Sequence, residues 1–211
     1  MLSASLAPLP ASGLLYLHGF NSGYGSPKAA LMRAACAKVA LPCETPQLPH
    51  RPAAALKMAE ALLKALGPRP LLVGSSMGGF LVTCLAERRG LPAVLVNPAV
   101  RPARLVEEWV GEVFVNEHTG ERFVIETAHR EELVELTPQR VCPERYLLLL
   151  GTADETLDPA DAFALYRGAR TILHPGGDHV FGMLESYLPA VLAHGGHYLP
   201  PGRVVTEVLE Q

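Results

Sequence analysis

Short runs of leucine and valine alternate along this chain with longer segments whose apolar residues recur every three or four positions. The longer spacing is typical of one face of a helix, whereas a short continuous apolar run is typical of a strand buried on both sides. We expect strands at 14–17, 70–74, 93–96, 145–150 and 170–173. This alternation predicts an α/β fold, in which helices cover both faces of a mostly parallel, twisted sheet.

The helical segments carry recognisable start and stop signals. Ser26 and Pro27 suit the N-cap and the first helical position, and Gly90 suits the end of a helix that runs from Ser76 to about Arg89. Further helices are expected from near 52 to 66, after the pair 158–159, and from about 180 to 193. These segments supply the two helical layers that the sheet needs.

The alternation breaks between Asn97 and Gln139. Two short apolar runs, 113–115 and 122–125, flank the turn 116–120 and predict a hairpin, and a helix is expected near 129–136. Ligands bind outside the carboxyl edge of open α/β sheets, and this segment connects two core strands. We therefore expect residues 97–139 to form a lid over that edge, with a plain surface insertion as the alternative.

The length of 211 residues fits one domain that buries enough surface to fold without a disulfide or metal. We place the α/β domain at 14–196. Residues 1–13 are expected to be a loosely ordered extension, and 197–211 a C-terminal tail with room for one short helix.

Charge and cysteine content exclude several classes of protein. The net charge is −3 without a cluster of lysine or arginine, so we expect no nucleic-acid partner.

No run of 18 apolar residues exists, so we expect no membrane span. The N-terminal residues lack the basic region of a signal peptide, and the four cysteines form no C-x-x-C pair, which favours reduced thiols and a cytoplasmic location. The cysteines are Cys36, Cys43, Cys84 and Cys142.

The string Gly74-Ser75-Ser76-Met77-Gly78 matches the G-x-S-x-G pattern of a nucleophile elbow. An expected strand runs directly into it, and an expected helix runs directly out. The elbow needs that context, because a tight turn lifts the serine oxygen above the sheet, with glycines where strand and helix pass closely. Ser76 is therefore the candidate nucleophile, and a plain glycine-serine loop is the alternative.

A serine nucleophile needs a histidine base and an acid that orients it. His179 follows a glycine-rich loop and is preferred to His174, which ends a strand and suits a structural hydrogen bond. Asp154 lies on the loop after the preceding strand, whereas Asp158 precedes a proline and suits a helix N-cap. Glu155 is expected to be solvated. The order serine, acid, histidine is that of α/β-hydrolases.

The oxyanion of an acyl-transfer reaction needs two backbone N–H donors. Met77 follows the nucleophile and supplies one, and Phe20 in the loop after the first strand supplies the other. His18 is expected to fix this loop by hydrogen bonding rather than to act as a base. Arg101 is a candidate for contact with an anionic substrate group, with a solvated or salt-bridged arginine as the alternative.

Aromatic residues are candidates for the substrate pocket, although each suits the core equally well. Those assigned to substrate binding are Trp109, Phe114, Phe123 and Phe181. A small lid favours short to medium acyl chains.

Several motifs together resemble the YqiA/YcfP family of small bacterial α/β-hydrolase esterases. They are LHGFNS at 17–22, PQLP at 46–49, GSSMGG at 74–79, VNPAVRP at 96–102, TG at 119–120 and GDH at 177–179. The resemblance spans roughly residues 14 to 194 and implies carboxylic-ester hydrolysis, extending to acyl thioesters, without cofactor or metal. By position the family's triad falls on Ser76, Asp154 and His179.

The expected function is that of a serine carboxylesterase acting through an acyl-enzyme on a small acyl ester or thioester. An acyl-CoA thioesterase with the same triad and a non-catalytic protein that binds an acyl ligand are the alternatives. The sequence leaves the oligomeric state and the physiological substrate open.

Overall fold

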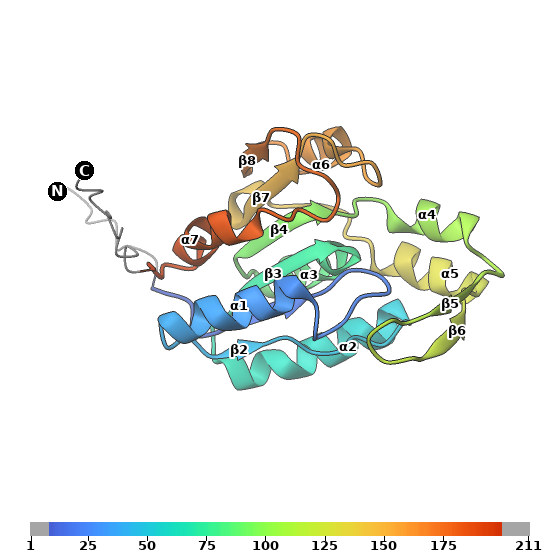
Figure 1. Ribbon diagram of the computed structural model, residues 1–211, viewed down its shortest axis with the longest axis horizontal. Helices are drawn as coiled ribbons and strands as arrows, with labels where there is room; N and C mark the ends of the chain where they lie inside the picture. The colour runs from blue at the N-terminus through green and yellow to red at the C-terminus, as the bar shows by residue number, and fades with distance from the viewer. Residues whose placement is uncertain (1–8, 200–211) are drawn as a thin grey trace, which may run out of the picture.

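A six-stranded sheet in the order β2-β1-β3-β4-β7-β8 forms the centre of the computed structural model, which describes residues 9–199 (Figure 1). Every neighbouring pair in this sheet is parallel. The α/β fold expected from the sequence is therefore confirmed. The strands are β1 (Leu14–Leu17), β2 (Cys43–Glu44), β3 (Leu71–Ser76), β4 (Ala93–Pro98), β7 (Tyr146–Gly151) and β8 (Arg170–His174). Only β2 was not expected, because two residues are too few to show a pattern.

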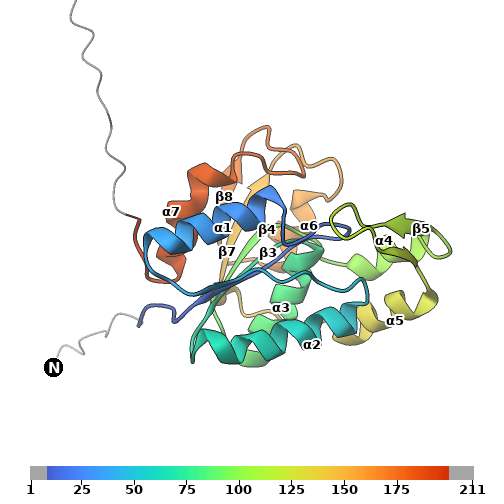
Figure 2. The ribbon, with the colours of Figure 1, turned by 60° about the horizontal axis from the view of Figure 1, so that its bottom comes forward.

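Helices cover both faces of the sheet (Figure 2). They are α1 (Pro27–Lys38), α2 (Pro52–Leu63), α3 (Met77–Arg89), α6 (Pro159–Leu165) and α7 (Leu184–His194), with short 3-10 turns η1 (Lys64–Leu66) and η2 (Pro143–Arg145). Side chains of β1 alternate between two cores: Leu14 and Tyr16 pack with α1 and α7, and Leu15 and Leu17 pack with α2 and α3. The continuous apolar strands thus fill both layers, as their composition predicts.

Local signals set most of the helix ends. Ser26 caps α1 by accepting a hydrogen bond from the Ala29 N–H, and Gly90 ends α3 in the left-handed conformation. The expected start of the last helix at 180 is wrong by four residues. Phe181 has φ 53° and its N–H donates to the Asp178 carboxylate, so the chain makes a turn there before α7 begins at Leu184.

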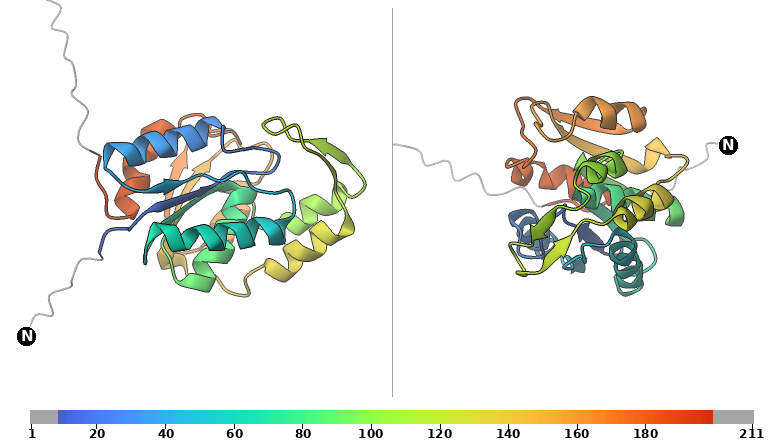
Figure 3. Two further views of the ribbon diagram at one scale, coloured as in Figure 1. Left: turned by 90° about the horizontal axis from the view of Figure 1, so that it is seen from below. Right: turned by 90° about the vertical axis from the view of Figure 1, so that its right-hand side faces the viewer.

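Most of the segment between β4 and β7 lies beyond the carboxyl ends of the strands, and its last residues return past α3 to the amino end of β7 (Figure 3). It contains α4 (Pro102–Glu108), the antiparallel hairpin of β5 (Val113–Val115) and β6 (Arg122–Val124), and α5 (Thr127–Leu136). We call residues 99–145 the excursion. The hairpin and α5 were expected, whereas α4 was not. Arg51 at the start of α2 forms ion pairs with Glu126 and Glu132 of the excursion. That the excursion closes as a lid stays a prediction.

The segment before β1 is partly fixed to the domain. The Ala11 N–H donates to the Gly195 carbonyl at 2.7 Å, and the Ser12 hydroxyl donates to the Leu66 carbonyl at 2.6 Å. Loose order through residue 13 is therefore wrong for residues 11–13. Residues 1–8 and 200–211 lie outside the described part of the chain. They include most of the tail for which a short helix was considered, and residues 197–199 are not helical. Within residues 9–199, no helix has both the length and the apolarity to cross a bilayer.

Candidate active site

The turn from β3 into α3 has the geometry of a nucleophile elbow. Ser76 has φ 54° and ψ −123°, a strained conformation that residues other than glycine rarely adopt. A Cβ on Gly78 would lie 2.1 Å from the Leu17 carbonyl oxygen, and one on Gly74 would lie 2.4 Å from the Gly78 carbonyl oxygen. No side chain fits at either position. The two glycines therefore let α3 pass against β1 and β3, as the motif requires.

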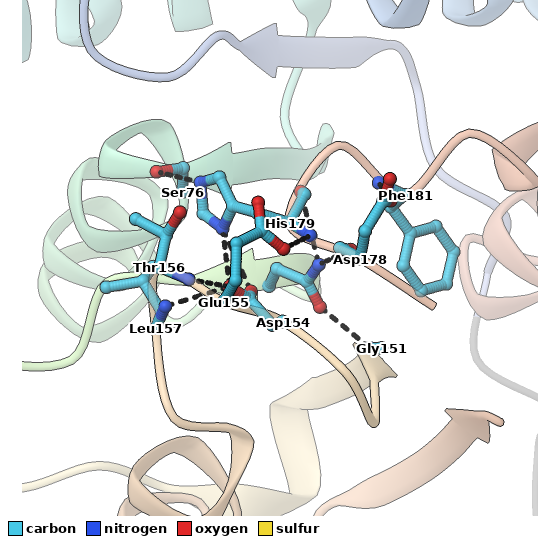
Figure 4. Close-up of polar contacts among 10 residues, drawn as sticks. Ser76, Gly151, Asp154, Glu155, Thr156, Leu157, Asp178, His179 and Phe181 are labelled. Atoms are coloured by element: carbon cyan, nitrogen blue, oxygen red, sulfur yellow. Dashed lines mark hydrogen bonds and ion pairs between the residues drawn. The ribbon is translucent and has the colours of Figure 1, made fainter. Parts of the chain in front are cut away.

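Three side chains from separate loops meet above this elbow (Figure 4). The Nε2 atom of His179 lies 3.2 Å from the Ser76 Oγ, and its Nδ1 lies 2.9 and 3.0 Å from the carboxylate oxygens of Asp154. The Asp154 side chain is 1% exposed and that of His179 is 21% exposed. Because the carboxylate accepts from Nδ1–H, Nε2 is left free to accept the serine proton. The structure thus brings together the three residues expected from the sequence.

The loop after β7 holds the carboxylate in place. Asp154 accepts hydrogen bonds from the N–H groups of Thr156 and Leu157 at 2.9 and 2.8 Å. Asp158 caps α6 through the Ala160 N–H, as its position before a proline predicts. Glu155 is exposed to solvent, as expected, and its carboxylate also accepts from the backbone N–H of the histidine at 3.1 Å.

Asn97 at the end of β4 connects the two loops that carry the acid and the histidine. Its Oδ1 accepts from the Gly151 N–H at 2.8 Å, and its Nδ2 donates to the carbonyls of Asp178 and His179 at 2.9 and 3.2 Å. It is buried and has φ 41°. Sequence reasoning did not assign it a role. The available signal was a polar residue at the carboxyl end of an otherwise apolar strand.

The loop after β1 (residues 18–22) lies directly over the serine, and we call it the oxyanion loop for the role predicted from the sequence. A Cβ on Gly19 would be 3.1 Å from the Ser76 Cβ. His18 fixes this loop as expected: its Nδ1 donates to the Gly19 carbonyl at 2.8 Å, and its Nε2 accepts from the Leu48 N–H at 3.0 Å. Burial lowers the pKa of His18, which favours this neutral form. That the N–H groups of Phe20 and Met77 hold an oxyanion stays a prediction.

Three of the four aromatic residues assigned to substrate binding pack around Phe20. Ring centroids of Trp109, Phe114 and Phe123 lie 5.2, 5.0 and 6.0 Å from that of Phe20. Two cavities border the oxyanion loop, and neither Trp109 nor Phe114 lines either of them. The structure therefore places these two rings as supports of the loop and not in a pocket wall.

The fourth aromatic residue, Phe181, lies at the edge of the cavity beside the serine, and most of its ring is buried in the core. It borders the cavity next to Ser76, but it is 1% exposed and packs on His174 and Tyr187. His174 makes the structural hydrogen bond expected of it, to the Tyr187 hydroxyl at 2.9 Å. Phe181 therefore anchors the histidine loop in the core.

Two cavities meet at Gly19 and Phe20. The first, which we call the apolar cavity, has a volume of about 50 Å³ beneath the excursion. Its walls include Leu48, Met77, Leu81, Phe123, Ile125 and Leu133. The second, which we call the serine cavity, has a volume of about 290 Å³. Its walls include Tyr16, Lys28, Ser76, His118, His179 and Leu184. The two cavities thus share the oxyanion loop as a wall, and the serine cavity has the larger share of polar groups.

Arg101 does not reach either of these cavities. It lies with Arg104, Asp158 and Asp161 around a separate cavity between α4 and α6, where two carboxylates accompany the two guanidinium groups. The expected contact of Arg101 with substrate therefore has no support at the serine. Between residues 9 and 199, histidine, cysteine and acidic side chains form no group of three that could hold a metal ion.

Comparison with known proteins identifies the fold. The family described as "Uncharacterised protein family (UPF0227)" matches residues 13–195. The structure is similar to Est1E from Butyrivibrio proteoclasticus, with a TM-score of 0.65, 14% identity and 88% of each chain covered. It is similar to the mouse alpha/beta hydrolase domain-containing protein 10, with a TM-score of 0.65, 17% identity, and 86% of this chain and 89% of that chain covered. A monoacylglycerol lipase from Paleococcus ferrophilus gives a TM-score of 0.63 at 18% identity, covering 88% of this chain and 96% of that chain. These likenesses show the α/β-hydrolase fold.

Proposed function

This chain belongs to the UPF0227 family, the YqiA/YcfP group that its motifs resemble, and from that premise we propose that it is a serine carboxylesterase. One observation carries the proposal: an unbroken chain of hydrogen bonds runs from Ser76 through His179 to Asp154. A serine on a strained elbow, a buried carboxylate and a histidine, in this order along the chain, perform acyl transfer in α/β-hydrolases.

The reaction has two steps of acyl transfer. His179 Nε2 takes the Ser76 proton while Oγ bonds to the carbonyl carbon, and the carbonyl oxygen becomes an oxyanion held by the N–H groups of Phe20 and Met77. The carbon–oxygen bond to the alcohol breaks, and the imidazolium gives its proton to that alcohol. Water then loses a proton to the same imidazole and attacks the acyl carbon of the acyl-enzyme. The bond from that carbon to Ser76 Oγ breaks, the imidazolium returns its proton to Oγ, and the acid is released. Asp154 stabilises the imidazolium in both steps.

The two cavities give the substrate an orientation. His179 must protonate the departing alcohol, and it borders the serine cavity, so we assign that cavity to the leaving group. The apolar cavity is bordered by Met77 and Phe20 and receives the acyl chain. One water needs roughly 10–15 Å³, so about 50 Å³ holds a short chain of a few carbon atoms. A structure named as a monoacylglycerol lipase shares the fold, which supports ester chemistry.

Active-site labelling tests the proposal. A fluorophosphonate should modify the wild-type chain at Ser76, and p-nitrophenyl butyrate should be hydrolysed. Ser76→Ala should lose both the label and the turnover while its circular dichroism spectrum is unchanged. Ser186→Ala, an exposed serine on α7, is the matched control and should keep both. Turnover of p-nitrophenyl butyrate by Ser76→Ala at the wild-type rate would refute the nucleophile and the proposed mechanism with it.

A further inference from the structure

We propose that Lys28 binds an anionic group on the leaving part of the substrate, so that the enzyme selects esters whose alcohol carries a carboxylate or a phosphate. The inference rests on the proposed function, because that function assigns the leaving group to the serine cavity. Lys28 lies in the first turn of α1 and borders this cavity together with Ser76 and His179. A charge in that position meets the leaving group, not the acyl chain.

The ammonium group of Lys28 has no carboxylate partner in the described part of the chain. It forms none of the ion pairs within 4.0 Å that residues 9–199 make. Asp178 is the acidic group that acts on it from a distance, and that carboxylate already accepts the Phe181 N–H at 2.9 Å. Burial lowers the pKa of Lys28, and Asp178 offsets part of this effect. A half-buried ammonium without a close counter-ion gains from a substrate anion.

The walls of the serine cavity favour negative charge. None of the residues that border it within 9–199 is acidic. Ser22 and His118 also border the cavity and add uncharged polar groups to its lining. The cavity around Arg101 differs, because Asp158 and Asp161 accompany its arginines. Lys28 is therefore the cation that faces open space beside the serine.

The volume of the serine cavity is large enough for a charged headgroup. About 290 Å³ exceeds many times the roughly 10–15 Å³ that one water needs. A carboxylate and a phosphate monoester share the chemistry that an ammonium group recognises. Matched substrates distinguish them: phenyl acetate is the neutral reference, 3-acetoxybenzoate carries the carboxylate, and 3-acetoxyphenyl phosphate carries the phosphate.

The kinetic test compares kcat/KM for each anionic ester with kcat/KM for phenyl acetate. The wild-type ratio should exceed one for at least one anion and should fall as salt is added, because ions screen the attraction. Lys28→Gln keeps a polar side chain, shortens the aliphatic stem and removes the charge, so it should lower that ratio about tenfold, as loss of a charge-assisted hydrogen bond does. Lys38→Gln, an exposed lysine at the other end of α1, should leave it unchanged. An equal ratio in the wild-type and Lys28→Gln chains would overturn the proposal.

A binding test separates this proposal from the proposed function. The full chain with Ser76→Ala is titrated calorimetrically with phenyl phosphate and with benzoate, and the same titrations are repeated with Lys28→Gln added. Weaker binding of either anion by about tenfold in the double variant supports the role of Lys28, whatever the turnover. Equal affinity in both chains refutes it, even if wild-type esterase activity is established. Failure of the wild-type chain to cleave any ester would instead refute the proposed function.

Discussion

Two groups of residues converge on Ser76, and they are held in place by different forces. The acid arm (97, 151–155 and 178–179) is fixed by short hydrogen bonds among buried polar groups, with Asn97 at its centre. The oxyanion arm (18–22 with the excursion) is fixed largely by packing of aromatic rings on Phe20. Two longer-range hydrogen bonds, from the amides of Asn21 and Asn116, tie its loop to the hairpin.

The difference predicts how each arm responds to change. A buried hydrogen bond depends steeply on geometry, and losing it leaves a polar partner unsatisfied. Aromatic packing is less directional and distributes its energy over many contacts. We therefore expect abrupt losses of rate from the acid arm and graded losses from the oxyanion arm.

The largest effect is expected from Asp154→Asn. The amide cannot hold His179 in the tautomer that accepts the serine proton, so kcat should fall about 10⁴-fold. Asp158→Asn is the matched control, because Asp158 caps α6 and does not touch the imidazole. It should change kcat little and cost at most about 1 kcal/mol of unfolding free energy. Steady-state kinetics and urea unfolding check both, and the reverse ranking would move the acid to Asp158.

The next effect is expected from Asn97→Ala. Removing the amide frees the histidine loop and leaves the Gly151 N–H without its acceptor, so kcat should fall about 100-fold with little change in KM. Unfolding free energy should fall by about 1–3 kcal/mol for the unsatisfied group. A structural role alone would lower stability and leave kcat per folded molecule at its wild-type value.

A smaller effect is expected from Trp109→Ala. Loss of the indole loosens Phe20 and misplaces one oxyanion donor. Removing a donor altogether lowers kcat by roughly 10²–10³-fold, so misplacing one should lower kcat by less, about tenfold. Trp109→Phe should restore most of the rate, because a ring again packs on Phe20. Val110→Ala, at the exposed neighbouring position, controls for changes to α4. Equal losses in the alanine and phenylalanine variants would show that ring packing does not position the loop.

The smallest effect is expected from lowering the pH, which should destabilise the oxyanion arm. Burial, Arg51 and His50 lower the pKa of His129, which accepts the Glu126 N–H and contacts His50 Nδ1 at 2.9 Å. The imidazole of His129 therefore binds a proton more readily in the unfolded chain than in the folded one. Its contribution to the free energy of unfolding is complete when the pH is above the ordinary pKa of 6.5, and it is lost as the pH falls below that value. Melting temperature should therefore drop between about pH 7.5 and 5.5. His129→Gln should show a shallower drop, and an unchanged slope would contradict this assignment.

Local patterns were sufficient to predict every strand of the main sheet except β2, the elbow and the N-cap at Asp158, because each depends on neighbours in the sequence. They selected Ser76, Asp154 and His179, since polar residues that follow parallel strands meet at one edge of the sheet. The role of Asn97 was not predictable, because it joins loops that begin more than fifty residues away in the chain.

Packing across distant segments explains the other differences. The start of α7 was misplaced because the left-handed Phe181 is fixed by tertiary contacts and not by helix propensity. The aromatic rings around Phe20 come from α4 and the hairpin, and α4 was itself missed. Position in the sequence did not distinguish a pocket wall from a support for the oxyanion loop.

The excursion leaves the sheet at the end of β4 and returns at β7, which is hydrogen-bonded directly to β4. Because these two strands are parallel, its attachment points lie at opposite ends of the strand pair, and a replacement segment must also run back past α3 to the amino end of β7. Grafting the corresponding segment of another family member would exchange the acyl-chain preference as a single cassette. Such a chimera would need to retain an aromatic partner for Phe20 and a hairpin amide for the Ser22 carbonyl, which sets the minimum design specification for recombination at this position.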